Sequence, residues 1–319
     1  MPSPERVPPA FPEPVPARTS VVVIGAGAVG TAVARALVAS GRYDLAAVHS
    51  RTRASAERAV LSIGAGAVEE SLLVAGRRGD VVFIATNDVA IAPVAAALAA
   101  GGGVRPGALV VHCSGALTAR EVLAPLAARS VAIGSIHPLQ TFSRSAGAPV
   151  AAIAGSLCAY EGDEGALVRL ERLARDLGGT PFRIHPESKP LYHAAAALAS
   201  NAVVALLSVA TGVLSRLGLA PAESLAALLP LVRGTVANLE SAGLPGALTG
   251  PIARGDVDVV RRHLESLRAA EPEALAVYVA LAEETIRVAR RRGSLSAEGE
   301  SILRALVVGA ARPSREAAP

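Results

Sequence analysis

Cysteine and aromatic side chains are scarce in this sequence. Its 319 residues include only two cysteines, Cys113 and Cys158, which lie far apart and match no metal-ligand spacing. Two such cysteines do not suggest a disulfide framework, so we expect a reducing, cytoplasmic location. Aromatic residues make up 3% of the chain, and the net charge of +4 comes from arginines scattered among acids. This composition argues against a nucleic-acid partner.

Long hydrophobic runs are also missing. No apolar stretch reaches membrane-spanning length without a charge, glycine or proline interrupting it, so we expect no membrane partner. The proline-rich start has no apolar signal core, which predicts a disordered leader over residues 1–18. A frayed tail is expected over residues 313–319. With 51% hydrophobic residues, the rest of the chain can fill one large core or two smaller ones.

Strand-like and helix-like patterns alternate from Ser20 to His185. Several strand-like runs are apolar throughout, which is typical of parallel strands covered by helices on both faces. The alternation predicts an α/β fold with an open, mostly parallel sheet. The expected strands are residues 20–25, 44–50, 80–86, 108–114, 130–137, 151–160 and 180–184, and the expected helices are residues 28–40, 53–60, 88–100, 118–127 and 163–177.

Beyond His185 the strand patterns stop, and apolar residues recur at the helical period up to Ala311. Breaks at Leu217–Gly218, Gly243–Gly250 and Arg292–Gly293 separate several helices. The sequence therefore predicts an α/β domain over residues 19–186 and an all-helical domain over residues 187–312. The helical half carries more apolar helix than a lone bundle of its size needs, so we expect a homodimer.

A glycine-rich turn joins the first expected strand to the first expected helix. The stretch VVVIGAGAVG has the spacing G-x-G-x-x-G, which in a strand–turn–helix context is typical of dinucleotide-binding sites. In that fingerprint the first glycine permits the tight turn, the second lets the backbone approach the pyrophosphate, and the third lets helix and strand pack closely. The predicted cofactor-binding residues here are Gly25, Ala26, Gly27, Ala28, Val29 and Gly30.

The end of the second expected strand indicates which dinucleotide binds. An NAD site typically carries an acid there for the ribose hydroxyls, but this sequence reads Ser50, Arg51 and Thr52. Arg51 can pair with a 2′-phosphate, and the two hydroxyls can hydrogen-bond to it. The sequence therefore predicts NADP, with a solvated loop arginine as the alternative.

Polar residues also follow the next strands. Thr86, Asn87 and Asp88 come after the third strand, and Ser114 and Gly115 end the fourth; all five are predicted to lie near the nicotinamide end of the cofactor. For Asp88, capping of the next helix explains the residue equally well. His137, which ends the fifth strand, is a candidate to donate a proton or bind a substrate carboxylate.

The start of the helical domain carries a polar stripe. At 100° per residue, Lys189, His193 and Ser200 fall within about 40° of one another, with Tyr192 beside them and Asn201 further round. A polar stripe on an apolar helix is costly unless it faces water or a site. Lys189 could protonate a developing alkoxide, with His137, His193 and Asn201 as orienting groups. The alternative is a helix start with a lysine that reaches to solvent.

The chain resembles Rossmann-like proteins whose C-terminal half is a domain of unknown function. The motifs that carry this resemblance are VVVIGAGAVG, SRT, HCSGAL, SIHPLQTF, KPLYHAAAALASN and ALTGPIARGD. That group is similar to ketopantoate reductases, pyrroline-5-carboxylate reductases and 6-phosphogluconate dehydrogenases. The resemblance implies an NADP-binding domain, a helical 6-phosphogluconate-dehydrogenase-like domain and a dimer. Lys189 matches the general-acid lysine of ketopantoate reductases, but His193 replaces the asparagine that follows it. His137 matches the substrate-binding histidine of prephenate dehydrogenases.

These observations predict an NADP-dependent oxidoreductase acting on a small carbonyl or imine compound, such as the 2-oxo acid ketopantoate. A prephenate-type dehydrogenase and a non-catalytic NADP sensor remain alternatives, because a fold alone does not establish chemistry. The six histidines lack ligand spacing with acids or cysteines, which argues against a metal-dependent enzyme.

Overall fold

The computed structural model describes residues 18–143 and 152–311. The chain divides into two compact units, Met1–Ala197 and Leu198–Pro319, and each is described here by itself. Apart from Arg18, the expected leader lies outside the described residues, as do the expected tail and residue 151 at the start of the sixth expected strand.

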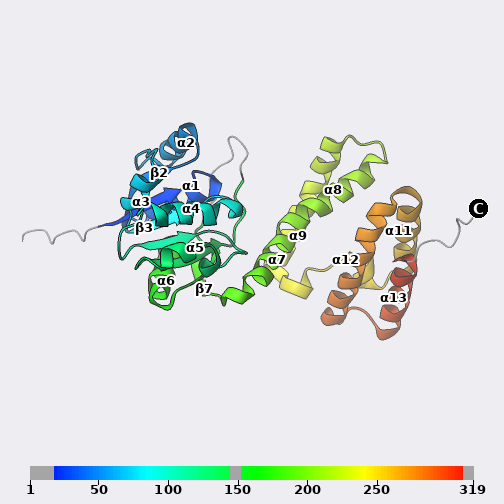
Figure 1. The fold of residues 1–319 in the computed structure, drawn as a ribbon. Coiled ribbons are helices and arrows are strands. Elements are labelled where there is room, and N and C mark those ends of the chain that lie inside the picture. Colours follow the sequence, from blue (N-terminus) through cyan, green and yellow to red (C-terminus); the bar gives the residue numbers. More distant parts are fainter. Residues whose placement is uncertain (1–17, 144–151, 312–319) are drawn as a thin grey trace, which may run out of the picture. The chain divides into compact units, whose positions relative to one another are not determined.

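A seven-stranded sheet forms the centre of the first unit, in the order β2-β1-β3-β4-β5-β6-β7 (Figure 1). Neighbouring strands pair in parallel, except that β6 runs antiparallel to β5. The predicted α/β fold with a mostly parallel sheet is therefore confirmed. The strands are β1 Thr19–Ile24, β2 Tyr43–His49, β3 Val81–Ile84, β4 Leu109–His112, β5 Ala132–Pro138, β6 Leu157–Gly162 and β7 Thr180–Arg183.

Helices on both faces of the sheet bury its apolar strands in two separate cores. Phe83 belongs to one core and Ile84 to the other, because successive side chains of a strand point to opposite faces. The short helix α3 was not predicted, because it has only six residues and shows no helical period. The helices are α1 Ala28–Ala39, α2 Arg53–Ile63, α3 Leu72–Arg77, α4 Asp88–Ala100, α5 Ala119–Ala127 and α6 Leu167–Asp176.

The boundary between the units lies later than predicted. Helix α7, Lys189–Ala199, was expected to open the helical domain, but the division falls between Ala197 and Leu198. The reason is that Lys189 and Tyr192 form hydrogen bonds to strands and turns of the first unit. The start of α7 is therefore attached to the first unit, although Lys189 is the only buried residue of this helix.

The second unit is helical throughout its described residues, as predicted. Its core is made by buried side chains of α10 to α13, such as Val260, Ile286 and Leu303. The expected breaks at Leu217, Gly243 and Arg292 are present, and two additional ones occur at Gly255–Asp256 and at Glu271. The helices are α8 Asn201–Ser215, α9 Pro221–Gly246, α10 Pro251–Arg254, α11 Val257–Ala270, α12 Pro272–Arg292 and α13 Ala297–Ala311.

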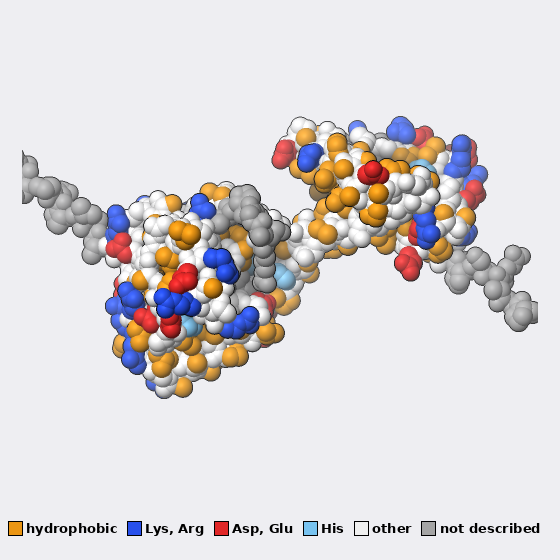
Figure 2. All heavy atoms as spheres, turned by 90° about the horizontal axis from the view of Figure 1, so that it is seen from above, with side chains coloured by type: hydrophobic (Ala, Val, Ile, Leu, Met, Phe, Trp, Pro, Cys, Tyr) orange, Lys and Arg blue, Asp and Glu red, His pale blue; other side chains and the backbone are white. Residues whose placement is uncertain are grey.

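One helical stretch, Pro186–Ser215, is long and apolar enough to cross a membrane by length and composition alone, and none of its most apolar window is buried. A charge and a proline, Lys189 and Pro190, interrupt its apolar run, but the helical conformation continues through them. No residue of α8 is buried, and large apolar side chains of α8 and α9 are exposed. Figure 2 shows such hydrophobic side chains on the surface of the helical part.

Candidate active site

A cavity of about 640 Å³ opens where the carboxyl ends of β1, β2 and β3 meet. Eight of the predicted cofactor-binding residues line it: Gly25, Ala26, Gly27, Ser50, Arg51, Thr52, Thr86 and Asn87. The lining also includes residues that the sequence analysis did not single out: Ile24, His49, Ser55, Leu72, Ala85, Ala90 and Val94. Ligands of open α/β sheets bind at this edge, where the strand order reverses.

Two of the three fingerprint glycines are required by the protein's own packing. Gly25 has a φ of +110°, and a Cβ there would lie 2.6 Å from the backbone of Ala85. A Cβ on Gly30 would lie 2.0 Å from the carbonyl oxygen of Gly25. Gly30 is buried against the turn and, like Ala28 and Val29, does not line the cavity. Gly25 and Gly30 are therefore needed for the backbone of the turn to pack closely, whether or not a ligand is bound.

Gly27 is different, because no protein atom requires it to be a glycine. A Cβ on Gly27 would have nothing within 4 Å, so it would project into open space. Gly27 is the N-cap of α1, where no side chain caps the helix and no acid lies in the first turn. The backbone N–H groups of this turn and the positive end of the helix dipole are thus left for an anion. This arrangement fits the pyrophosphate of a dinucleotide.

The arginine at the end of β2 also fits its predicted partner. Arg51 is exposed, lines the cavity and has no ion pair among the described residues. Arg53, two positions later, is bonded to Glu57 at 2.7 Å and to Glu70 at 2.6 Å. No acid is found among the described residues that line the cavity, while Ser50, Thr52 and Ser55 supply hydroxyls. A 2′-phosphate would find a free cation here rather than a carboxylate.

Ser114 connects the ends of β3 and β4. Its hydroxyl donates to Asp88 Oδ2 at 2.9 Å and accepts from the backbone N–H groups of Ala116 and Leu117. Asp88 therefore bridges to the next strand end instead of capping α4, whose N-cap Asn87 makes no side-chain cap bond. Asp88, Ser114 and Gly115 do not line the cavity. They hold the turn that follows β4.

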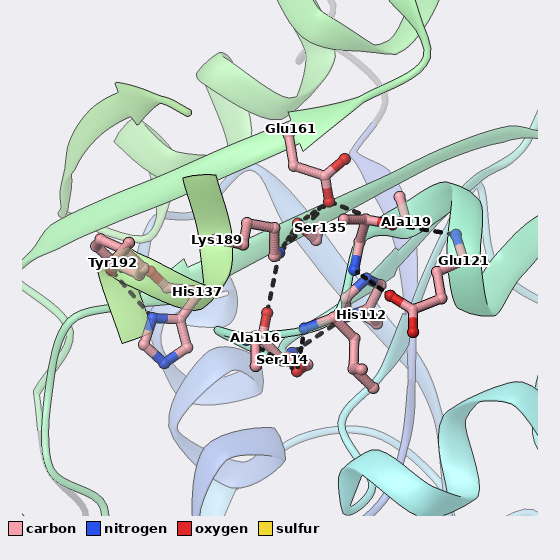
Figure 3. A network of polar contacts seen from close by, with 12 residues as sticks. His112, Ser114, Ala116, Ala119, Glu121, Ser135, His137, Glu161, Lys189 and Tyr192 are labelled. Carbon is pink, nitrogen blue, oxygen red and sulfur yellow. Dashed lines mark hydrogen bonds and ion pairs between the residues drawn. The ribbon is translucent and has the colours of Figure 1, made fainter. Parts of the chain in front are cut away.

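Lys189 lies beneath that turn and is 2% exposed. Its ammonium donates to the Ser114 carbonyl oxygen at 3.1 Å, to Ser135 Oγ at 2.6 Å and to Glu161 Oε1 at 3.4 Å. The same Glu161 oxygen accepts from Ser135 Oγ and from the backbone N–H of Ala119 (Figure 3). All three N–H bonds of the ammonium therefore have acceptors inside the first unit.

The ammonium of Lys189 was predicted to face the substrate, but here it bonds to Ser114, Ser135 and Glu161. Burial lowers the pKa of the ammonium below its ordinary value, and the Glu161 carboxylate opposes that shift. The alternative of a lysine that reaches to solvent is wrong, because the side chain is buried and paired. Within the first unit, the ammonium supports the Ser114–Gly115 turn from below and does not face the cavity.

His137 packs against the same turn. A Cβ on Gly115 would lie 2.9 Å from His137 Nε2 and 2.6 Å from His193 Cδ2, so both imidazoles pack against this glycine. The two rings meet edge to face, with their centroids 5.9 Å apart. Burial lowers the pKa of His137 to about 4, so the ring is neutral at pH 7. The structure thus brings His137, His193 and Gly115 together.

The polar stripe predicted along one continuous helix is wrong beyond α7. Ser200 has non-helical backbone angles and separates α7 from α8. Asn201, the first residue of α8, is exposed and belongs to the second unit. Its predicted orienting role stays a prediction.

Glu161 was not predicted from the sequence, and Tyr192 was placed beside the polar stripe without a role in the site. Glu161 lies in β6 within CAYEGD, where its burial and its pairing with Ser135 depend on the antiparallel register. The sequence does contain one indication that Lys189 has a special environment. Lys189 is its only lysine, since every other cation is an arginine. A compact ammonium fits three converging acceptors that a planar guanidinium does not.

Two domain families match the chain. Residues 6–138 match the Rossmann-like domain, and residues 156–285 match the domain of unknown function DUF2520. The chain joins a Rossmann-like domain to a DUF2520 domain. No curated protein matches it.

Solved structures share the fold at low sequence identity. Protein TM1727 from Thermotoga maritima is 27% identical, with a TM-score of 0.61 over 85% of this chain and 99% of that one. BF3122 from Bacteroides fragilis, a candidate NADP oxidoreductase, is 24% identical, with a TM-score of 0.67 over 85% and 98%. A reductive aminase from Aspergillus terreus, solved with NADPH and ethyl-5-oxohexanoate, is 19% identical, with a TM-score of 0.54 over 94% and 95%.

Proposed function

We propose that this protein is an NADP-dependent oxidoreductase that transfers a hydride between the nicotinamide and a small carbonyl or imine substrate. The observation that carries the proposal is the cavity beside α1, where Gly27 leaves an uncapped helix N-terminus and Arg51 supplies an unpaired cation. The pyrophosphate and the 2′-phosphate are the anionic groups of NADP, and these two features of the cavity fit them. The fold shared with a reductive aminase that holds NADPH supports the same cofactor.

The residues around Gly115 are proposed to form the substrate side of the site. When bound, the cofactor supplies or accepts the hydride, and the protein positions the reactants. His137 and His193 flank Gly115 and are the proposed groups that orient the substrate. Lys189 acts through the Ser114 carbonyl oxygen and keeps this turn in place. The direct proton donation expected of Lys189 requires an ammonium that faces the substrate, which its three internal bonds oppose.

Turnover by the full chain tests the proposal. NADPH oxidation is followed by absorbance with 2-oxo acids, including ketopantoate, and with cyclic imines, including pyrroline-5-carboxylate. NADP⁺ reduction is followed with prephenate. We expect turnover with a 2-oxo acid or an imine. Tight NADPH binding without turnover on any compound would favour the cofactor-sensing alternative, and an absence of NADPH binding would overturn the proposal.

Arg51→Gln is expected to weaken NADPH binding about 10- to 100-fold and to leave NADH binding unchanged. A hydrogen bond to a charged group contributes about 1.5–3 kcal/mol, and only NADPH carries the 2′-phosphate. Isothermal titration calorimetry with both cofactors measures the effect. Arg53→Gln is the matched control, because Arg53 is already paired with Glu57 and Glu70. Equal losses in the two variants would contradict the assignment of Arg51.

We also propose that the protein is a homodimer through the exposed apolar side chains of α8 and α9. Val204 is 70% exposed and Leu231 is 68% exposed, and exposed apolar patches of this kind mark interfaces. Sedimentation velocity should show a dimer for the wild type and a monomer for Val204→Glu. Leu61→Glu, at an 84% exposed position of α2, should remain a dimer. A monomeric wild type at micromolar concentration would refute this interface.

A further inference from the structure

The imidazole of His137 is held on one side by the hydroxyl of Tyr192. The oxygen of Tyr192 lies 3.0 Å from His137 Nδ1, and the two rings meet edge to face with centroids 5.5 Å apart (Figure 3). The other ring nitrogen, Nε2, faces Gly115 and has no hydrogen-bond partner among the described residues. The two nitrogens of His137 therefore have different surroundings, one fixed by the protein and one turned toward the turn after β4.

The proton of Tyr192 has two acceptors in reach, and their distances differ. Besides His137 Nδ1 at 3.0 Å, the hydroxyl lies 3.5 Å from the His137 carbonyl oxygen, at the outer limit of a hydrogen bond. Burial raises the pKa of Tyr192 to about 12, so the phenol keeps its proton at neutral pH. The neutral ring of His137 carries one N–H and one bare nitrogen. When the phenol donates to Nδ1, the N–H is at Nε2.

We propose that Tyr192 is a positioning residue that holds neutral His137 in the Nε2–H tautomer, so that His137 directs a hydrogen-bond donor at the substrate's carbonyl oxygen. The inference rests on the proposed function for its catalytic consequence, but the tautomer is a property of the protein alone. A neutral imidazole that donates to a carbonyl polarises it without giving up its proton. A donor aimed where negative charge develops stabilises the transition state.

The groups that face His137 from the neighbouring elements are compatible with this role. His193 of α7 meets the ring edge to face, and both His193 and the Lys189 ammonium disfavour a positive charge on the His137 ring. No carboxylate contacts His137 among the described residues. The charged imidazolium is thus disfavoured, and the choice between the two neutral tautomers is left to Tyr192.

The test combines nuclear magnetic resonance with kinetics on the full chain. In protein labelled with ¹⁵N-histidine, long-range proton–nitrogen spectra at pH 7 report which ring nitrogen carries the proton, and His137→Gln identifies the signal. We expect the Nε2–H tautomer in the wild type and a loss of this preference in Tyr192→Phe. With a carbonyl substrate, Tyr192→Phe should lower kcat about tenfold with little change in KM, which corresponds to a net hydrogen bond of about 1.4 kcal/mol.

The second unit contains a matched control. Tyr278 Oη lies 3.0 Å from His263 Nδ1, with the rings edge to face at 5.9 Å, so Tyr278→Phe removes the same contact elsewhere. Tyr278→Phe should alter only the His263 signal and leave kcat unchanged. An Nδ1–H tautomer of His137 in the wild type, or an unchanged tautomer in Tyr192→Phe, would overturn the inference. Failure of the proposed function would instead appear as absent turnover in every protein, with the tautomer still readable.

Discussion

Replacing Lys189 by methionine should lower the free energy of unfolding of the first unit by about 3–5 kcal/mol, the range found when one partner of a buried ion pair is removed. The substitution leaves the Glu161 carboxylate, which is 3% exposed, without its cation. It also takes a donor from Ser135 Oγ and from the carbonyl oxygen of Ser114. Urea denaturation followed by circular dichroism measures the change.

Two further variants distinguish the contribution of the ammonium's shape to stability from the contribution of its charge. Lys189→Arg keeps the charge, but its planar guanidinium cannot direct three short bonds at these acceptors, so we expect most of the loss to persist. Lys189→Met combined with Glu161→Gln removes both charges and should recover part of the stability. If Lys189→Met proved as stable as the wild type, the buried network would not be a structural element of the fold.

Because Lys189 is the only lysine, chemical modification reads out its burial directly. An amine-reactive reagent should modify Lys189 only after the chain is unfolded. Mass spectrometry locates the modified residue. Fast labelling of Lys189 in the folded protein would restore the case for an ammonium that faces the substrate.

Alanine at Gly27 and alanine at Gly30 should give opposite results. Gly27→Ala places its methyl in open space and should leave the melting temperature unchanged while weakening NADPH binding at least about tenfold. Gly30→Ala places its methyl 2.0 Å from the Gly25 carbonyl oxygen and should destabilise the first unit by about 1–3 kcal/mol, as overpacking typically does. Scanning calorimetry and NADPH titration measure the two effects.

The contrast between these glycines is the decisive comparison, because both variants add the same methyl group within the six residues that follow β1 and within one fingerprint. A ligand-free role for the turn predicts that Gly27→Ala leaves NADPH binding unchanged. A turn that binds the pyrophosphate predicts that binding falls while stability stays the same. Equal stability of Gly30→Ala and the wild type would mean that the backbone moves away easily at this point.

The strands and the glycine turn could be predicted from the sequence because they depend on neighbours in the chain. Apolar runs such as VVFI and LVVH became buried parallel strands, and the turn after β1 became the N-terminus of α1. Arg51 could be located from its distance to the glycines, since one βαβ unit fixes that distance. Local spacing was sufficient in each of these cases.

The interior of the site could not be predicted in this way, because its contacts join distant parts of the chain. Lys189 meets Glu161 and Ser114 across 28 and 75 positions, and His137 meets Tyr192 across 55. Neither the hydrophobic period of a helix or strand nor the spacing of a motif predicts contacts between residues so far apart in the sequence. The sequence placed Lys189 on a polar helix face, but whether that face turned to solvent or into the sheet depended on the packing of α7.

The sequence by itself determined an α/β sheet with a dinucleotide-type turn and a helical second half, since both follow from short-range patterns of apolar residues and glycine. Only the tertiary structure decided that the start of α7 is bonded to the first unit, that Asp88 bonds to Ser114 instead of capping its helix, and that the single lysine is buried under the turn after β4. The physical reason is that a buried polar group must find its partner wherever the fold places one.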